Sequence, residues 1–131
     1  MRVSFAKITR GGEYSRNLLA DLWGYSSYHA IARGVVTPQN DNNIVLFVTE
    51  QKQDSLEQYA DHLDGEVLHW EGPNDHFAEE RMLNASSTGQ EIHLFYRLRH
   101  HTDFTYKGTV TVASHKLHTN RPSKFTLKLT R

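Results

Sequence analysis

The sequence predicts an α+β domain built around a curved or closed β-barrel of about six strands, with two or three short helices. Short stretches with a two-residue apolar period are interrupted by single helical patterns, without the regular strand–helix alternation of a doubly wound sheet. The solid apolar run Ile44–Val48 is typical of a strand buried on both faces. Since 131 residues suffice for one hydrophobic core, we expect a single domain over residues 1–131.

The first third is expected to hold a strand, a helix and a structured segment. Alternating apolar residues over 2–8 predict a first strand, which ends before Gly11. Ser15 is a typical N-cap residue for a helix that ends at Gly24, and the segment 25–34 is a further helical turn or an ordered loop. The apolar face of the helix is expected to consist of three leucines: Leu18, Leu19 and Leu22.

The remaining elements follow from the same patterns. Strands are predicted at five stretches: 43–50, 66–71, 91–99, 104–113 and 124–129. Helical spacing marks the polar stretch 51–64 and the stretch 74–84, for which Asn74 is the predicted N-cap. Polar residues 100–103 separate two alternating stretches, so a hairpin tip is expected there.

Charge is balanced in total but uneven along the chain. Lys and Arg together number 15, as do Asp and Glu, so no global field attracts polyanions and a non-specific nucleic-acid binder is disfavoured. Carboxylates crowd between Asp41 and Glu91. The last third of the chain is instead rich in cations, which are Arg97, Arg99, Lys107, Lys116, Arg121, Lys124, Lys128 and Arg131. The folded chain is therefore able to present a basic face.

Several classes of chemistry lack a sequence signal. The chain has no cysteine, which excludes disulfides, thiolate metal sites and cysteine nucleophiles. The histidines form three tight clusters, but none has the spacing of a His-Glu-x-x-His site, and no Gly-x-Ser-x-Gly elbow occurs. No apolar run approaches the ~20 residues of a membrane span. We expect a soluble cytoplasmic protein with no membrane partner, catalytic residue, metal or cofactor.

Aromatic residues beside carboxylates are more informative. A base extruded from DNA needs an aromatic face to stack on and a carboxylate or amide to bind its Watson–Crick edge. The candidates for such a base pocket are Tyr25, Tyr28, Tyr59, Asp61, Trp70 and Glu71. Core packing is the competing interpretation of each ring. The candidates for contacts with DNA phosphates or a groove are Arg10, Arg16, His29, Arg33, Lys52, Arg97, Arg99, His100, His101 and Lys107.

Six motifs in order carry a family resemblance. They are Tyr14-Ser15-Arg16, Ile44-Val45-Leu46-Phe47-Val48-Thr49, Tyr59-x-Asp61, Gly65-x4-Trp70-Glu71-Gly72, Ile92-His93-Leu94-Phe95-Tyr96-Arg97 and Phe104-Thr105-Tyr106-x-Gly108. Over roughly residues 12–130 the chain resembles the SRA-like or PUA-like recognition domains attached to HNH endonucleases and to phospholipase-D-type restriction helicases. The resemblance implies a β-barrel with short helices that recognises methyl- or hydroxymethylcytosine in duplex DNA. Cleavage is then expected in a separate nuclease domain.

Three other functions remain as alternatives. The first is a DNA reader of sequence or shape that does not flip a base, with the segment around Tyr28–Arg33 entering the major groove. The second is a PUA-like RNA-binding module, which prefers RNA to methylated duplex DNA. The third is a small metal hydrolase that uses the histidine clusters, and a bound divalent ion distinguishes it.

Overall fold

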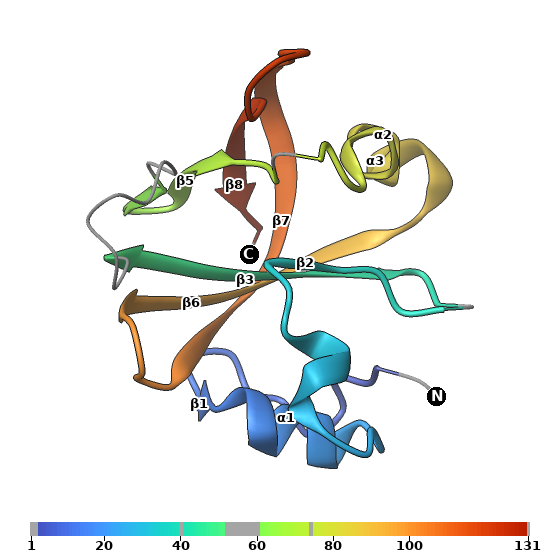
Figure 1. Cartoon of the computed structure of the whole chain (residues 1–131), viewed down its shortest axis with the longest axis vertical. Helices are drawn as coiled ribbons and strands as arrows, with labels where there is room; N and C mark the ends of the chain where they lie inside the picture. The colour runs from blue at the N-terminus through green and yellow to red at the C-terminus, as the bar shows by residue number, and fades with distance from the viewer. Residues whose placement is uncertain (1–2, 40, 52–60, 74, 131) are drawn as a thin grey trace.

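The computed structural model describes residues 3–39, 41–51, 61–73 and 75–130 (Figure 1). Its helices and strands follow in the order β1 (Glu13–Tyr14), α1 (Arg16–Leu22), the 3-10 turn η1 (Tyr28–Ile31), β2 (Val35–Val36), β3 (Asn43–Gln51), β4 (His62–Asp64), β5 (Val67–Glu71), α2 (Glu79–Leu83), α3 (Ala85–Thr88), β6 (Glu91–Arg99), β7 (Phe104–Lys116) and β8 (Lys124–Leu129).

The strands form one curved mixed sheet in the order β2-β3-β6-β7-β8-β5-β4, and β1 pairs with β7. Only β3 and β6 run parallel among the described pairs. β7 pairs with β6 through its first half and with β8 through its second half, and register shifts after Leu94 and Val112 mark bulges that bend the sheet. The predicted β-rich architecture with few helices is confirmed. The described strands number eight and do not close into a barrel.

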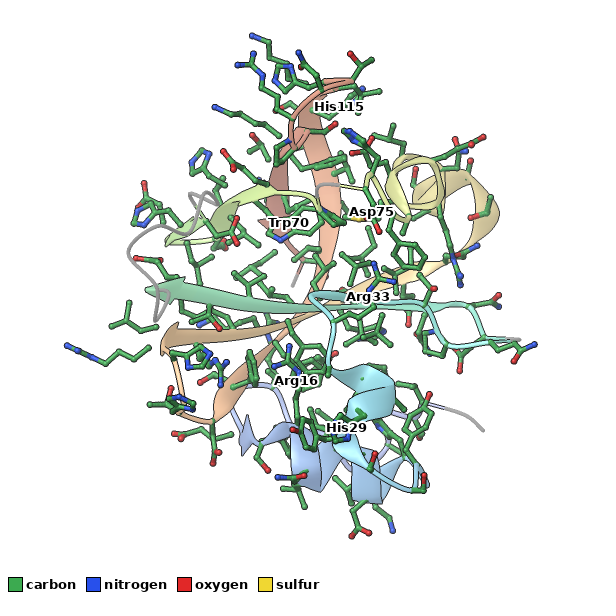
Figure 2. The ribbon with its side chains drawn as sticks, viewed as in Figure 1. Arg16, His29, Arg33, Trp70, Asp75 and His115 are labelled. Carbon is green, nitrogen blue, oxygen red and sulfur yellow. The ribbon has the colours of Figure 1, made fainter. Side chains whose placement is uncertain are left out.

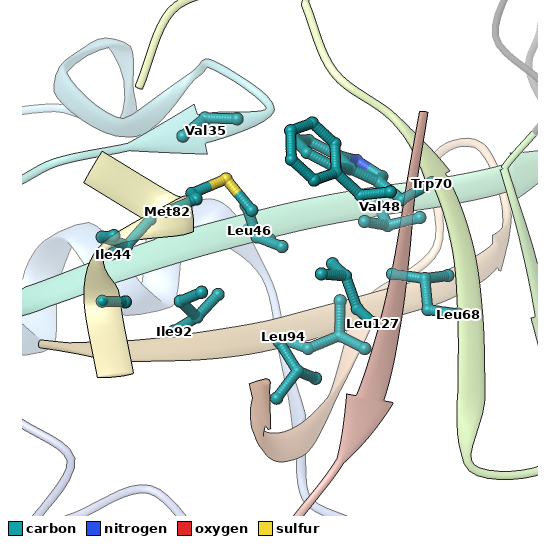
Figure 3. Close-up of a cluster of buried hydrophobic side chains, with 13 residues drawn as sticks. Val35, Ile44, Leu46, Val48, Leu68, Trp70, Met82, Ile92, Leu94 and Leu127 are labelled. Carbon is teal, nitrogen blue, oxygen red and sulfur yellow. The ribbon is translucent and has the colours of Figure 1, made fainter. Parts of the chain in front are cut away.

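Two hydrophobic cores lie on opposite faces of β3. Ile44, Leu46 and Val48 point into the first core (Figure 3), whereas Val45 and Phe47 point into the second. The first core also contains Val35, Leu68, Trp70, Met82, Ala85, Ile92, Leu94, Val110, Phe125 and Leu127. The second contains Val3, Leu19, Ala20, Trp23, Ile31, Val36, Phe95, Phe104 and Tyr106. The predicted central strand, buried on both faces, is therefore confirmed.

The predicted first strand over 2–8 is wrong. Described residues 3–10 form turns and irregular backbone, and pairing with β7 starts where Gly11 N–H donates to the carbonyl oxygen of Tyr106 at 2.8 Å. Val3 and Phe5 instead pack onto the second core from outside the sheet. Alternation of apolar residues does not distinguish a strand from an irregular segment that covers a core.

Helix α1 has the predicted cap but a different buried face. Ser15 Oγ accepts the N–H of Leu18 at 3.0 Å, as expected of an N-cap. Leu19 is buried together with Ala20 and Trp23, whereas the other two predicted leucines are exposed. The indole of Trp23 has more apolar surface to bury than a leucine, and its Nε1 donates to the carbonyl oxygen of Ser4 at 2.8 Å.

The helix predicted at 74–84 is shorter than expected, and the helical pattern at 51–64 is contradicted at the two ends that the structure describes. The described part of the stretch 74–84 contains α2 only from Glu79, because His76 and Ala78 adopt φ values of 59° and 67°, which no right-handed helix tolerates. The expected N-cap Asn74 lies outside the described residues. In the stretch 51–64, residues 52–60 also lie outside them, and Leu63 belongs to strand β4.

His93 forms a buried hydrogen-bonded network beside the second core. Its Nδ1 lies 2.7 Å from Tyr106 Oη, its Nε2 lies 3.0 Å from Asn43 Oδ1, and the Phe5 ring stacks on it at 3.6 Å between centroids. Nε2 faces two acceptors, Asn43 Oδ1 and Glu91 Oε1, so Nε2 carries the proton. Burial raises the pKa of Tyr106 to about 12, so its hydroxyl stays protonated and donates to the free Nδ1. The imidazole is consequently held neutral with its proton on Nε2.

This network predicts acid-sensitive stability. Burial lowers the pKa of His93, against the raising effect of the Glu91 carboxylate. The unfolded chain binds more protons once the pH falls below the unfolded value of about 6.5, so the free energy of unfolding decreases there. Chemical denaturation from about pH 5 to pH 7.5 should show a shallower pH dependence for His93→Gln than for the wild type. Equal slopes for the two proteins would contradict this assignment.

Candidate nucleic-acid interface

A buried carboxylate lies where β4 meets β5. Asp61 immediately precedes β4 and is 7% exposed. Antiparallel pairing of His62 with His69 brings it to the end of β5, where its Oδ1 accepts the N–H of Glu71 at 2.9 Å. A carboxylate that is buried to this extent requires hydrogen-bond donors, and the backbone amide supplies one. Asp61 is thus a fixed acceptor at one end of the sheet.

Trp70 and Glu71 lie on the adjoining strand. Trp70 is 5% exposed, and its ring belongs to the first core, 5.5 Å from the Phe125 ring (Figures 2 and 3). With Phe125 and three polar neighbours, the two residues line a surface pocket of about 270 Å³ on β5 and β8, whose further members are His69, Lys124 and Thr126. The indole forms part of a wall rather than an open stacking face.

A second carboxylate holds β4 in place. Glu50 Oε1 accepts the hydroxyl of Tyr96 at 2.7 Å and the N–H of Leu63 at 3.0 Å, and its Oε2 lies 3.2 Å from His62 Nδ1. Burial by itself raises the pKa of Glu50, but these hydrogen bonds outweigh it and lower that pKa. Burial and the same carboxylate hold the pKa of Tyr96 far above its usual value. The cluster joins three strands beside Asp61, and sequence reasoning missed its role.

Two of the predicted site residues share another pocket. Tyr25 and Arg33 line a hollow of about 250 Å³ together with Phe77, at the edge formed by β2. The Arg33 guanidinium lies 4.4 Å above the Phe77 ring and 3.3 Å from Asp75 Oδ2 (Figure 2). Both charged side chains are more than half exposed, so this ion pair contributes little to stability and Arg33 remains accessible to an anion.

The exposed turn η1 lies next to this pocket. Tyr28 is 40% exposed, and its ring stacks on His29 with 4.3 Å between the centroids. Arg16 holds the turn from within, donating from Nε to the carbonyl oxygen of Ile31 at 3.1 Å and from Nη2 to that of Arg33 at 3.4 Å. Tyr28, predicted for the base pocket, and His29, predicted for a DNA contact, are therefore presented on a fixed backbone.

Arg16 and Arg97 have roles inside the fold. Both guanidiniums lie over the Phe104 ring, and burial together with the charge of Arg97 lowers the pKa of Arg16 to about 10. Arg97 donates to Thr49 Oγ1 at 2.7 Å and to the carbonyl oxygen of Thr102 at 3.0 Å. These contacts fix η1 and the hairpin tip, so any effect of the two arginines on DNA binding is partly indirect.

The other predicted contacts are distributed over several places. Arg10 donates to the carbonyl oxygen of Thr130 at 2.8 Å. Four residues lie on β6, β7 or the turn between them: Arg99, His100, His101 and Lys107. Tyr59 and Lys52 lie outside the described residues. The structure thus brings Asp61, Trp70 and Glu71 together at one place and Tyr25 and Arg33 at another, rather than gathering one pocket.

Two further properties of the described chain bear on its chemistry. Within residues 3–39, 41–51, 61–73 and 75–130, no group of three or more His, Asp or Glu side chains has an arrangement that holds a metal ion. No helix in the same ranges combines the length and apolar character needed to cross a membrane.

Comparison with models of known protein families assigns the chain to one family. The family model described as "Domain of unknown function (DUF3427)" matches residues 8–131. The chain belongs to the DUF3427 family. No curated protein matches the sequence of this DUF3427 domain.

Solved structures share the fold of the DUF3427 domain. The SUVH5 SRA domain in complex with hemi-methylated CG DNA matches with a TM-score of 0.64 and 13% sequence identity, covering 99% of this chain and 94% of that one. The same SRA domain with fully methylated CG DNA gives 0.62 and 14%, at equal coverage. AspBHI, a DNA modification-dependent restriction endonuclease, matches 73% of this chain and 59% of its own at a TM-score of 0.45 and 13% identity. The two matches to the SUVH5 SRA domain show that the DUF3427 domain has an SRA-like fold, as the resemblance implied.

Proposed function

We propose that this domain binds duplex DNA and recognises methyl- or hydroxymethylcytosine as the specificity element of a modification-dependent restriction system. Cleavage belongs to a nuclease domain that is fused to it or associated with it. The observation that carries the proposal is the buried Asp61 carboxylate, oriented by the Glu71 amide beside the Trp70 wall. The SRA-like fold supports it, since the SUVH5 SRA domain was solved with methylated CG DNA.

The chemistry of cytosine fits a fixed carboxylate. The exocyclic amino group of the base is a donor, and Asp61 and Glu71 are the acceptors proposed to bind it once the base leaves the stack. Trp70 supplies apolar surface for the base at this site, and Arg33, in the separate hollow beside Tyr25, supplies a phosphate contact. Extrusion costs a few kcal/mol, and phosphate contacts offset this cost. DNA binding is therefore expected to weaken steeply with salt.

The direct test compares otherwise identical duplexes that contain cytosine, methylcytosine or hydroxymethylcytosine at one position. Burying one methyl group contributes about 1 kcal/mol, so a preference of roughly fivefold or more for a modified duplex is expected. An RNA duplex of the same sequence serves as competitor. Equal affinity for all three DNA duplexes removes modification from the function, and preference for the RNA replaces it with the RNA-binding alternative.

Extrusion is tested separately with 2-aminopurine next to the target base. Its fluorescence is quenched in the stack, so binding of the wild-type domain to the modified duplex should increase the signal. A preference for modified DNA without any fluorescence change indicates a reader that inspects the groove from outside, through η1. The unmodified duplex at saturating protein is the control for non-specific distortion.

A further inference from the structure

The hairpin formed by β7 and β8 extends beyond the rest of the sheet, with His115 near its end (Figures 1 and 2). Three cations lie on it, all of them exposed: Lys116, Arg121 and Lys124. The sequence from Phe104 to Arg131 contains no aspartate or glutamate. Among the described residues, none of the three cations forms an ion pair. We call residues 114–124 the basic hairpin.

The register of the basic hairpin places like charges opposite each other. Lys116 pairs with Lys124 across β7 and β8, and like charges at directly opposed positions destabilise a sheet. Partial desolvation and the charges of the three cations also lower the pKa of His118. The fold thus tolerates a repulsive concentration of positive charge, and an anionic partner would relieve this repulsion.

The basic hairpin is anchored beside Asp61, Trp70 and Glu71, which we call the candidate base site. Lys124 pairs with Glu71 across β5 and β8, and both residues line the pocket of about 270 Å³ described above. Ser123 is fully buried at the turn, where its carbonyl oxygen accepts the N–H of Gly72 at 2.9 Å and its Oγ accepts the N–H of His118 at 3.1 Å. Because these bonds order the hairpin before binding, contact with DNA costs little conformational entropy.

We propose that the basic hairpin grips the phosphate backbone of duplex DNA next to the candidate base site. The inference deepens the proposed function and rests on it. Lys116 and Lys124 contact phosphates without reading bases, so they raise affinity for modified and unmodified duplexes alike. Duplex DNA is favoured over a small anion because the cations are spread along a projecting arm, whereas a small anion needs an enclosed site.

The test is a double variant, Lys116→Gln with Lys124→Gln, measured by DNA binding at several salt concentrations. Affinity for the modified and the unmodified duplex should fall by the same factor, roughly 10- to 100-fold at low salt, and the plot of log affinity against log salt should become shallower by about 1.8. The variant should be folded and close to the wild type in stability, because both side chains are exposed and the repulsion removed between Lys116 and Lys124 offsets the lost pairing of Lys124 with Glu71. The matched control is Lys7→Gln with Lys128→Gln, which removes the same charge from exposed positions outside the hairpin.

A second variant and the ratio of affinities separate the two proposals. Lys116→Arg with Lys124→Arg retains both charges and should restore binding. If the glutamine variant binds as the control does, or if it changes only the preference for modified DNA, the role of the basic hairpin is refuted and the proposed function stands. If the wild type shows no preference for modified DNA while the glutamine variant still loses affinity and salt dependence, the proposed function is refuted and the role of the basic hairpin stands. A wild type that binds no duplex DNA overturns both.

Discussion

Asp61→Asn is expected to lose most of the preference for modified DNA while the domain remains folded. The asparagine side chain retains an oxygen that can accept the Glu71 N–H, so the local backbone keeps its partner. The charged acceptor proposed for the cytosine amino group is lost, and hydrogen bonds to charged groups contribute about 1.5–3 kcal/mol. A duplex bound without base recognition keeps its phosphate contacts, so affinity for the modified duplex should fall to about that for the unmodified duplex. With the preference expected above, this is a loss of roughly fivefold, with little change for the unmodified duplex.

The control for this experiment lies on β4, the strand that Asp61 precedes. Asp64 ends β4 and is exposed, so Asp64→Asn removes an equal charge without touching the candidate site. Fluorescence anisotropy with both duplexes, at one salt concentration, measures all three proteins. If Asp61→Asn retains the wild-type preference, Asp61 is only a structural carboxylate and the proposed recognition chemistry loses its central residue.

Trp70→Ala is expected to cost about 3–5 kcal/mol of folding free energy, the range found for large aromatic residues in cores. The ring is 5% exposed and packs among Leu68, Val48 and Phe125 in the first core, so truncation leaves a cavity (Figure 3). Urea denaturation monitored by circular dichroism measures the loss. Trp70→Phe retains an aromatic wall and should lose substantially less stability.

His69→Ala is the control for Trp70→Ala, because His69 is an exposed neighbour on β5 and its truncation should change stability by at most about 0.5 kcal/mol. DNA binding of Trp70→Phe distinguishes the two roles of the residue. If Trp70 only forms a wall of the site, Trp70→Phe should bind DNA as the wild type does. If the base stacks directly on the indole, the smaller phenylalanine ring should lower the affinity for DNA. Wild-type stability in Trp70→Ala is incompatible with the packing described here.

Local signals predicted the local structure. The N-cap at Ser15, the buried run in β3 and the hairpin tip between β6 and β7 each depend on a few consecutive residues, and the structure contains all three. The strand predicted at 2–8 is absent from the described residues, and the helix predicted at 74–84 begins only at Glu79, for a physical reason. The apolar residues of both stretches cover a core, and residues that cover a core do not need a regular backbone. At His76 and Ala78 the backbone has positive φ values.

The candidate site was predicted only in part, because its assembly depends on strand register. The alternation in β5 already places Trp70 on the same face as Leu68, which indicated burial. By contrast, nothing near Glu50 in the sequence indicates Tyr96 as its partner, since that contact requires the pairing of β3 with β6. The excess of cations in the last third was visible in the sequence. Its concentration on one arm follows only from the pairing of β7 with β8.

The parallel pairing of β3 with β6 has a consequence for how the molecule assembles. Asn43 pairs with Glu91, so this pair closes a long loop that contains β4, β5, α2 and α3, including Asp61 and Trp70. Loop closure of this kind costs chain entropy before any contact compensates it, and proteins rich in such distant contacts fold slowly. The domain is accordingly a high-contact-order protein. Its ability to engage a ligand should appear late in refolding, after secondary structure has formed.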